Sequence, residues 1–217
     1  MYSSLIAWIM HYNTVLFYSI NLGMENGFLN TLMPDLTNFG SFIAWGIICG
    51  LIYLFGGSKS KQIAILGLAA LILGNAVVYV LKYVVAEPRP FLVLGNVHQL
   101  VPESEVYSFP SGHSASSFAV ATVLGLKYSL NFKNKRFRLI YPLIAFAALI
   151  GFSRVYIGVH YPLDVVFGAL IGILSALTVL RLEDNIFNGK ISRMIYMDKL
   201  VNLDILGYCK KLVKNRN

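Results

Sequence analysis

Three short stretches of the chain carry residues that can perform acid–base and anion chemistry. The stretch at residues 153–164 places Arg154, His160 and Asp164 at the junction between two apolar runs. Ionisable groups at a membrane boundary are costly, which makes them candidates for function. Two further stretches supply Lys82, Arg89, Ser111, Gly112 and His113. A set of three cations, two histidines, one carboxylate and a Ser-Gly turn suits a tetrahedral oxyanion such as phosphate.

The basic residues and the Ser-Gly turn are candidate phosphate ligands. Arg89 and Arg154 can each make bidentate contacts with phosphate oxygens, and Lys82 adds a point charge. Ser111 and Gly112 open an apolar run, where the free N–H groups of a helix start form an anion site. Ser111 offers its hydroxyl as well, and glycine allows the backbone to come close. These donors can also stabilise the charge of a phosphoryl-transfer transition state.

The two histidines are candidates for the reacting groups. Asp164 follows His160 by four residues, near the start of a predicted helix. Its carboxylate can accept a hydrogen bond from one imidazole nitrogen and leave the other directed at phosphorus, which makes His160 an oriented nucleophile. His113 lies two residues after Ser111 and can protonate the leaving oxygen, then deprotonate the attacking water.

The composition is that of an integral membrane protein. Of 217 residues, 57% are hydrophobic and 13% are charged, and the mean hydropathy is +0.66, whereas soluble domains carry about 25% charged residues. We predict an all-α, polytopic membrane helix bundle. Cys49 lies in an apolar run and Cys209 in a basic tail, which indicates neither a disulfide nor a metal site.

Five apolar runs are long enough to cross about 30 Å of hydrocarbon. They are residues 36–55, 63–81, 111–130, 139–157 and 162–180. Residues 1–23 are apolar but are interrupted by His11, Asn13 and Asn21. This segment is either a sixth span or an amphipathic helix in the membrane plane, and we favour the second interpretation.

The remaining segments are predicted loops and a tail. Residues 24–35 are interpreted as a loop. Residues 83–110 are a second loop, in which Pro88, Pro90 and Pro102 exclude one continuous helix. We divide the chain into an N-terminal interfacial helix and loop at residues 1–35, a membrane core that carries the candidate site at residues 36–181, and a basic tail at residues 182–217.

The distribution of charge predicts an orientation. Only Lys82, Arg89 and Arg154 lie outside three basic segments, which are residues 56–62, 127–138 and 181–217. The positive-inside rule places these segments, and the C-terminus, in the cytoplasm. The candidate site then lies on the outer face, where acidic residues dominate. The net charge of +8 is therefore an orientation signal, and nucleic acid is not expected as a partner.

Some of these residues have simpler interpretations when each is taken alone. Lys82 or Arg154 by itself is often an interfacial cation whose charged end reaches water. The acidic residues of the outer loop, Glu87, Glu103 and Glu105, are interpreted as solvated charges. The joint presence of the histidines and cations in three stretches favours a catalytic site.

The three stretches resemble the signature motifs of the type 2 phosphatidic acid phosphatase family. The motifs read K-x6-R-P from Lys82, P-S-G-H from Pro110 and S-R-x5-H-x3-D from Ser153. This family includes membrane lipid phosphatases, bacterial polyprenyl diphosphate phosphatases, glucose-6-phosphatase and vanadium haloperoxidases. The resemblance covers roughly residues 36–181. It implies a phosphohistidine intermediate on His160, acid–base catalysis by His113, and no required metal or cofactor.

The expected function is hydrolysis of a lipid phosphate or diphosphate at the outer membrane face. The resemblance is shared with compact prokaryotic members of the family that act on polyprenyl diphosphates. A polyprenyl diphosphate, cleaved to its monophosphate, is therefore the expected substrate. Alternatives are a phosphatidylglycerophosphate or phosphatidate phosphatase, a lipid phosphotransferase, and a non-catalytic transporter. The expected partners are a lipid phosphate and the bilayer, and no oligomeric state is predicted.

Overall fold

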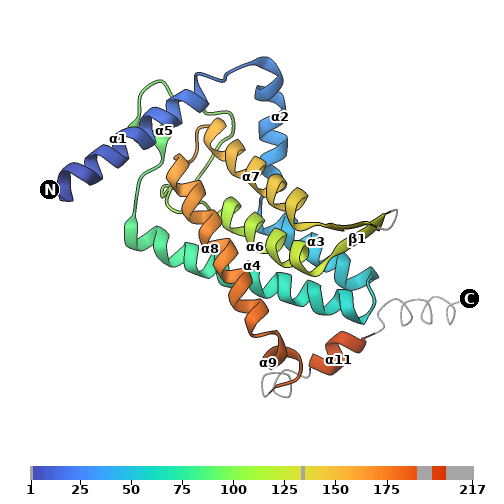
Figure 1. Ribbon diagram of the computed structural model, residues 1–217. Coiled ribbons are helices and arrows are strands. Elements are labelled where there is room, and N and C mark those ends of the chain that lie inside the picture. Colours follow the sequence, from blue (N-terminus) through green and yellow to red (C-terminus); the bar gives the residue numbers. More distant parts are fainter. Residues whose placement is uncertain (1, 133–134, 190–196, 204–217) are drawn as a thin grey trace, which may run out of the picture.

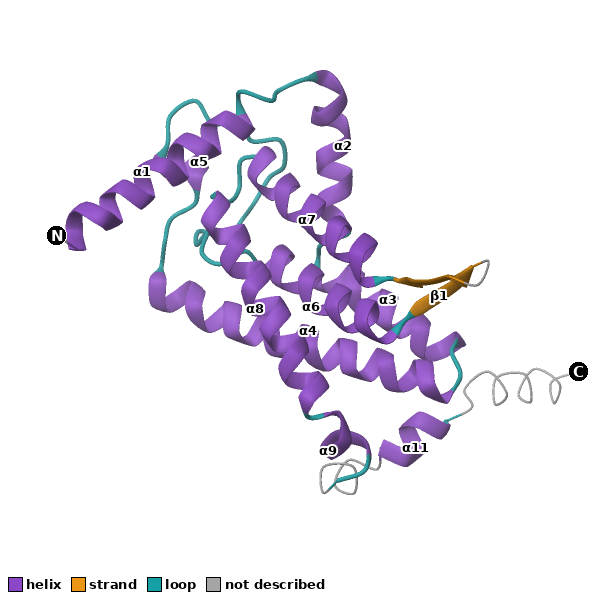
Figure 2. Cartoon of the chain, viewed as in Figure 1, coloured by secondary structure: helices purple, strands orange, loops and turns teal. Residues whose placement is uncertain are grey.

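The chain forms a helical bundle with one small hairpin. A computed structural model describes residues 2–132, 135–189 and 197–203 (Figure 1). Figure 2 shows that almost every element is a helix. The elements are α1 (Tyr2–Asn21), α2 (Gly27–Asn38), α3 (Phe42–Phe55), α4 (Ser58–Val85), α5 (Pro90–Val93), α6 (Gly112–Lys127), β1 (Ser129–Phe132), β2 (Lys135–Arg138), α7 (Ile140–Tyr156), α8 (Pro162–Arg181), α9 (Glu183–Phe187) and α11 (Met197–Asn202).

Helix α6 is the centre of the bundle and packs against α4, α7 and α8. Its side chains from Ser114 to Gly125 are buried. The close approach of α8 requires glycine. A Cβ on Gly168 would lie 2.4 Å from the carbonyl oxygen of Ser111, and one on Gly172 would lie 2.4 Å from that of Ala115. Small residues of this kind let membrane helices pack closely, and they bring the first turns of α6 and α8 together.

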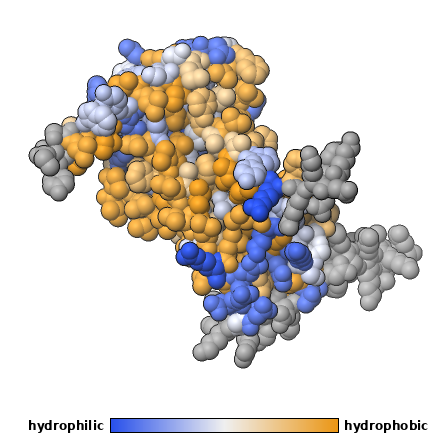
Figure 3. All heavy atoms as spheres, in the orientation of Figure 1, coloured by the Kyte–Doolittle hydropathy of each residue, from blue (hydrophilic) through white to orange (hydrophobic). Residues whose placement is uncertain are grey.

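The surface and the helices are those of a membrane protein. By length and composition, α4 and α8 can each cross a membrane, and α2 with α3 forms a third candidate if the bent pair is one span. Helix α7 is apolar but shorter. Each of the five predicted runs contains a helix. Among the described residues, two helices, or three spans if the bent pair counts as one, are long and apolar enough to cross a membrane, so the number of five spans stays a prediction. Figure 3 shows hydrophobic side chains across the middle of the visible face and hydrophilic ones at its ends.

The prediction of a loop at residues 24–35 is wrong, because α2 occupies most of it. The side chain of Asn26 caps this helix by accepting a hydrogen bond of 3.0 Å from the Leu29 amide. Pro34 lies inside the helix but does not end it.

The predicted run at residues 36–55 is also not one straight helix. Helices α2 and α3 meet at a bend of 58°. Ser41 caps α3, since its hydroxyl accepts a hydrogen bond of 3.1 Å from the Ala44 amide. The bend places Gly40 beside His113, where a Cβ on the glycine would lie 3.1 Å from Cδ2 of the ring.

Helix α1 is fastened to the bundle by the polar residues that interrupt its apolar sequence. The Asn21 amide group donates to the carbonyl oxygens of Tyr156 at 2.7 Å and His98 at 2.8 Å. Asn13 accepts a hydrogen bond of 3.0 Å from the Leu163 amide. These bonds hold α1 against the end of α7 and the start of α8. The in-plane interpretation of this helix stays a prediction.

The segments after α6 differ in detail from the sequence prediction. The run predicted to reach residue 130 ends at Lys127, and the basic turn that follows forms an antiparallel hairpin in which Ser129 pairs with Arg138. Helices α9 and α11 belong to the predicted tail, while Cys209 and the rest of that tail lie outside the described residues.

Candidate active site

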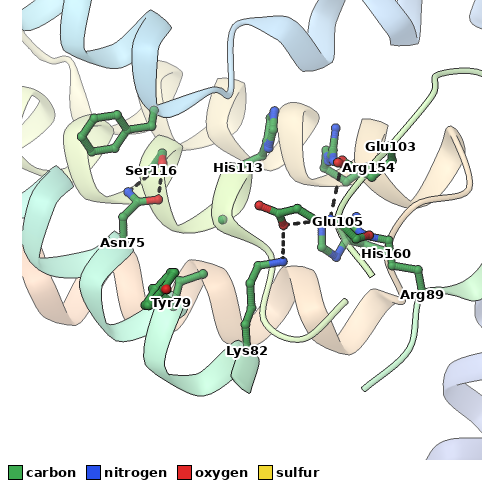
Figure 4. A pocket seen from close by; sticks show the side chains of 13 residues that line it. Asn75, Tyr79, Lys82, Arg89, Glu103, Glu105, His113, Ser116, Arg154 and His160 are labelled. Atoms are coloured by element: carbon green, nitrogen blue, oxygen red, sulfur yellow. Dashed lines mark hydrogen bonds and ion pairs between the residues drawn. The ribbon is translucent and has the colours of Figure 1, made fainter. Parts of the chain in front are cut away.

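The three motif stretches meet at one cavity of about 340 Å³. It lies among the end of α4, the start of α6, the junction between α7 and α8, and the loop that follows α5 (Figure 4). Its walls are Phe42, Asn75, Val78, Tyr79, Lys82, Arg89, Glu103, Glu105, Gly112, His113, Ser116, Arg154 and His160. The packing of the helices therefore assembles side chains that are far apart in the sequence. Lys82 and His160, for example, are separated by 78 positions.

His160 is held in one orientation by buried hydrogen bonds. Its Nδ1 lies 3.2 Å from Oδ2 of Asp164 and 3.3 Å from the Ser108 hydroxyl. The same carboxylate accepts hydrogen bonds from the Ser108 hydroxyl and from the Tyr161 amide, the latter at 2.8 Å. Asp164 thus occupies one side of the ring, while Nε2 lies on the other side, 3.3 Å from Nη1 of Arg89.

The local backbone explains how His160 reaches this place. Helix α7 ends at Tyr156, and Gly158 has a φ of +84°, a left-handed conformation that favours glycine. A Cβ at this glycine would lie 2.8 Å from the carbonyl oxygen of His98. The chain turns tightly there and enters α8 through Pro162 at its first position.

His160 is neutral at physiological pH. Burial lowers the pKa of its imidazole well below the usual value, and the positive charges of Arg154 and Arg89 lower that pKa further. A depressed pKa means that the ring stays unprotonated as the pH falls through 6.5. A neutral ring with Nδ1–H directed at Asp164 carries its lone pair on Nε2, as a nucleophile requires.

Every predicted phosphate-binding cation is paired with a glutamate of the loop after α5. Lys82 Nζ lies 2.7 Å from Oε2 of Glu105, and Arg89 Nη2 lies 3.1 Å from the same atom. Arg154 Nη2 lies 2.9 Å from Oε2 of Glu103. Burial alone would raise the pKa of Glu105, but Lys82 and Arg89 outweigh it and lower that pKa. The Glu105 carboxylate is therefore an anion among the predicted phosphate-binding cations.

The interpretation of Glu103 as a solvated loop charge is wrong, while Glu105 is 60% exposed but is paired with Lys82 and Arg89. The Glu103 side chain is 19% exposed and contacts both arginines. A signal was available in the sequence. Residues two apart in an extended segment point to the same side, and three cations without counter-ions would be costly to bury. The loop spacing of two residues therefore predicts a pair of carboxylates on one side.

The arginines are also fixed by the backbone and by α2. Arg89 donates to the carbonyl oxygens of Glu105 at 2.6 Å and Val159 at 3.0 Å. Arg154 Nη1 donates to the Thr37 hydroxyl at 3.1 Å, a partner that lies in the segment predicted to be one apolar span. Among the described residues, the buried Nε of Arg154 has no hydrogen-bond partner, so this donor is free to bind a ligand.

His113, Gly112 and Ser111 form the start of α6. His113 and Gly112 line the cavity, whereas Ser111 is fully buried behind it. The Ser111 hydroxyl acts as the helix N-cap and accepts a hydrogen bond of 3.4 Å from the Ser114 amide. Its amide donates to the carbonyl oxygen of Asp164 at 3.0 Å. Ser111 therefore holds the helix start in place, and Asp164 likewise lies behind the cavity wall.

Apolar helices, a buried neutral histidine and three cations at one cavity are features that suit a membrane phosphatase. Residues 63–187 match the sequence profile of the PAP2 superfamily, so the protein belongs to that family. The resemblance found in the sequence motifs is thereby confirmed. Groups of three or more metal-binding side chains do not occur among the described residues.

Similar proteins include two named as undecaprenyl-diphosphatases and one of known structure. The chain is 31% identical to the undecaprenyl-diphosphatase BcrC of Bacillus subtilis (strain 168), over 75% of this chain and 79% of that one. It is 31% identical to an undecaprenyl-diphosphatase of Sulfolobus acidocaldarius, over 85% and 84% of the two chains. The crystal structure of Aquifex aeolicus LpxE has a TM-score of 0.66 and 32% identity, covering 78% of this chain and 95% of that one.

Proposed function

We propose that this protein hydrolyses a polyprenyl diphosphate to its monophosphate and orthophosphate through a phosphohistidine on His160. The observation that carries the proposal is the cavity, which joins a neutral buried histidine and three cations to an apolar wall. Phe42, Val78 and Tyr79 form that wall. The relatives that are undecaprenyl-diphosphatases support the choice of lipid.

The apolar wall lies on α3 and α4, which pack against each other. Val78 and Tyr79 come one turn before Lys82 on α4, so they lie on the same face but deeper in the helix. The Tyr79 side chain is 64% exposed at the outside of the bundle. A lipid can thus keep its chain in hydrocarbon beside α4 while its terminal phosphate meets Lys82 and the arginines.

The reaction proceeds in two displacements. Nε2 of His160 attacks the terminal phosphorus, and the bond from phosphorus to the bridging oxygen breaks as His113 protonates that oxygen. Lipid monophosphate leaves, and His113 then takes a proton from water as the water oxygen attacks the phosphohistidine. Orthophosphate leaves and neutral His160 is restored. Arg89, Arg154, Lys82 and the amides of Gly112 and His113 stabilise the equatorial oxygens, and Ser111 and Asp164 orient these groups.

Glu103 and Glu105 must leave the cations before a phosphate can bind. We expect Glu105→Gln to tighten inhibition by orthovanadate about tenfold, because one charge-assisted contact contributes about 1.5–3 kcal/mol. The measurement is the vanadate inhibition constant at fixed salt. Asp35→Asn is the matched control, since this exposed acid lies on α2, away from the cavity. Weaker vanadate binding in Glu105→Gln would mean that the glutamate helps to build the phosphate site.

The substrate is tested by comparing kcat/KM for three lipids in matched detergent micelles. We expect a polyprenyl diphosphate to be preferred over phosphatidate and phosphatidylglycerophosphate. A tenfold preference for either glycerophospholipid, about 1.4 kcal/mol in transition-state binding, would overturn the assignment and leave the phosphatase chemistry intact.

Phosphatidylglycerophosphate is the second candidate substrate. Phosphatidylglycerophosphatase B of Bacillus subtilis is 39% identical over 90 residues, which cover 40% of this chain. A solved phosphatidylglycerolphosphate phosphatase from the same organism has a TM-score of 0.66 and 26% identity, over 82% of this chain. Transfer of the phosphoryl group to another alcohol is tested in the same assay by adding acceptor lipids.

We also propose a topology of five spans with the site outside and the C-terminus in the cytoplasm. The segregation of Lys and Arg supports it. In a Cys209→Ser background, where the remaining Cys49 is buried, we expect Gln99→Cys to react with an impermeant maleimide in intact cells. Ser58→Cys, at the first position of α4, should react only after lysis. The reverse pattern would overturn this orientation.

A further inference from the structure

Two uncharged polar residues line the cavity on the side away from His160. Asn75 of α4 and Ser116 of α6 are joined by a hydrogen bond of 2.9 Å from the Asn75 Nδ2 to the Ser116 hydroxyl. The same amide nitrogen donates to the Leu71 carbonyl oxygen at 2.8 Å. Figure 4 shows this pair across the cavity from His160, with Lys82 and His113 between them.

The pair lies deeper along both helices than the catalytic groups. Ser116 follows His113 by three residues, which places it on the same face of α6 and about 4.5 Å further along. Asn75 precedes Lys82 by seven residues, about 10 Å along α4. Its side chain borders the helix start, since a Cβ on Gly112 would lie 3.8 Å from Asn75 Oδ1.

A polar pair at this depth has a structural interpretation that must be weighed. Side-chain hydrogen bonds between membrane helices contribute about 0.6 kcal/mol each, and Trp45 with Ser117 forms such a bond at 3.0 Å. That bond is buried outside the walls of the cavity. Asn75 and Ser116 instead line the cavity beside His113, so their donors can reach a bound molecule.

The proposed line of attack indicates which part of a bound diphosphate would lie beside Asn75 and Ser116. The terminal phosphorus lies at His160 and the bridging oxygen at His113. The inner phosphate, which stays on the lipid, lies beyond that oxygen, toward the apolar wall and deeper along α6. We propose that Asn75 and Ser116 form a subsite for this inner phosphate, an inference that rests on the proposed function.

Neutral donors suit this position. In the substrate the inner phosphate is bonded to two bridging oxygens and carries a single negative charge, which amide and hydroxyl donors can bind without burying another cation. A phosphate oxygen would replace the bond between Asn75 and Ser116, while the bond from Asn75 to Leu71 remains. A lipid with one phosphate has no group at this subsite and gains nothing from it.

The deciding variant is Asn75→Asp, which keeps the side chain's size and can still accept from Ser116. It places a negative charge beside the inner phosphate. We expect kcat/KM for the polyprenyl diphosphate to fall at least about tenfold, the loss for one charge-assisted hydrogen bond, while kcat/KM for phosphatidate changes less than about twofold. Inhibition by inorganic pyrophosphate should weaken in the same proportion, and inhibition by orthophosphate should not change.

Ser117→Ala is the matched control, because this neighbour on α6 is buried and does not line the cavity. The activity and the unfolding temperature of Asn75→Ala test whether the pair only stabilises the helix contact or also binds substrate. Equal losses on both lipids in Asn75→Ala, restored by Asn75→Asp, would overturn the subsite. So would unchanged pyrophosphate inhibition in Asn75→Asp. The pyrophosphate measurement needs no lipid, so it tests the subsite even if the lipid panel rejects the polyprenyl substrate.

Discussion

Replacement of His160 by alanine is expected to abolish the covalent phosphoenzyme and to lower kcat by about 10⁴-fold or more, as loss of a nucleophile does in other hydrolases. The reason is that Nε2 forms the bond to phosphorus, and the remaining cations only bind the substrate. The measurement is the amount of protein-bound phosphate after a brief reaction with radiolabelled lipid and a quench in base, in which phosphohistidine survives. The assay is run in EDTA, since the cations replace a metal in this mechanism.

Two further variants serve as a control and as a comparison for His160→Ala. His98→Ala is the matched control, because His98 is a histidine of the loop after α5 that lies 3.5 Å from Glu25 and does not line the cavity. It should keep full activity. Asp164→Asn should lose less activity than His160→Ala, since Asp164 orients the ring. A phosphoenzyme that still forms in His160→Ala would assign the nucleophile to another residue.

Replacement of His113 by alanine is expected to lower kcat/KM on phosphatidate, whose leaving group is an alkoxide, by about 10²- to 10⁴-fold, the range for loss of a general acid. The loss should depend on the leaving group. A nitrophenyl phosphate releases a stable phenolate that hardly needs a proton, whereas an alkyl phosphate releases an alkoxide that does. The measurement is therefore the ratio of kcat/KM for these two substrates in the wild type and in His113→Ala.

The outcome that contradicts this role is an equal loss on both substrates. Packing must be controlled, because Gly40 closely approaches the His113 ring. His113→Asn keeps a polar side chain of similar reach but cannot act as an acid near neutral pH. It should show the same dependence on the leaving group as His113→Ala, with an unfolding temperature closer to that of the wild type.

The sequence by itself determined the chemistry of this protein and its class. The candidate residues lie in short motifs with fixed spacings. His160 and Asp164, for example, are four residues apart, and this spacing lets the carboxylate reach the imidazole ring. Two other patterns can also be read along the chain. Some hydrophobic runs are long enough to cross a membrane, and most Lys and Arg residues lie in three segments that the positive-inside rule places on one side. The helical membrane fold, the PAP2 family and the candidate residues could therefore be predicted.

Only the tertiary structure decided which side chains meet across the bundle. Nothing local indicates that Thr37 of α2 accepts from Arg154, or that Asn75 and Ser116 share one cavity. The loop spacing of Glu103 and Glu105 indicates a pair of carboxylates, but the cations that they contact lie on other elements and could not be assigned from it. Such pairings depend on close contacts between helices, as at Gly168 against Ser111. Packing of this kind is set by shape across many residues at once, and hydrophobic periodicity along the chain does not encode it.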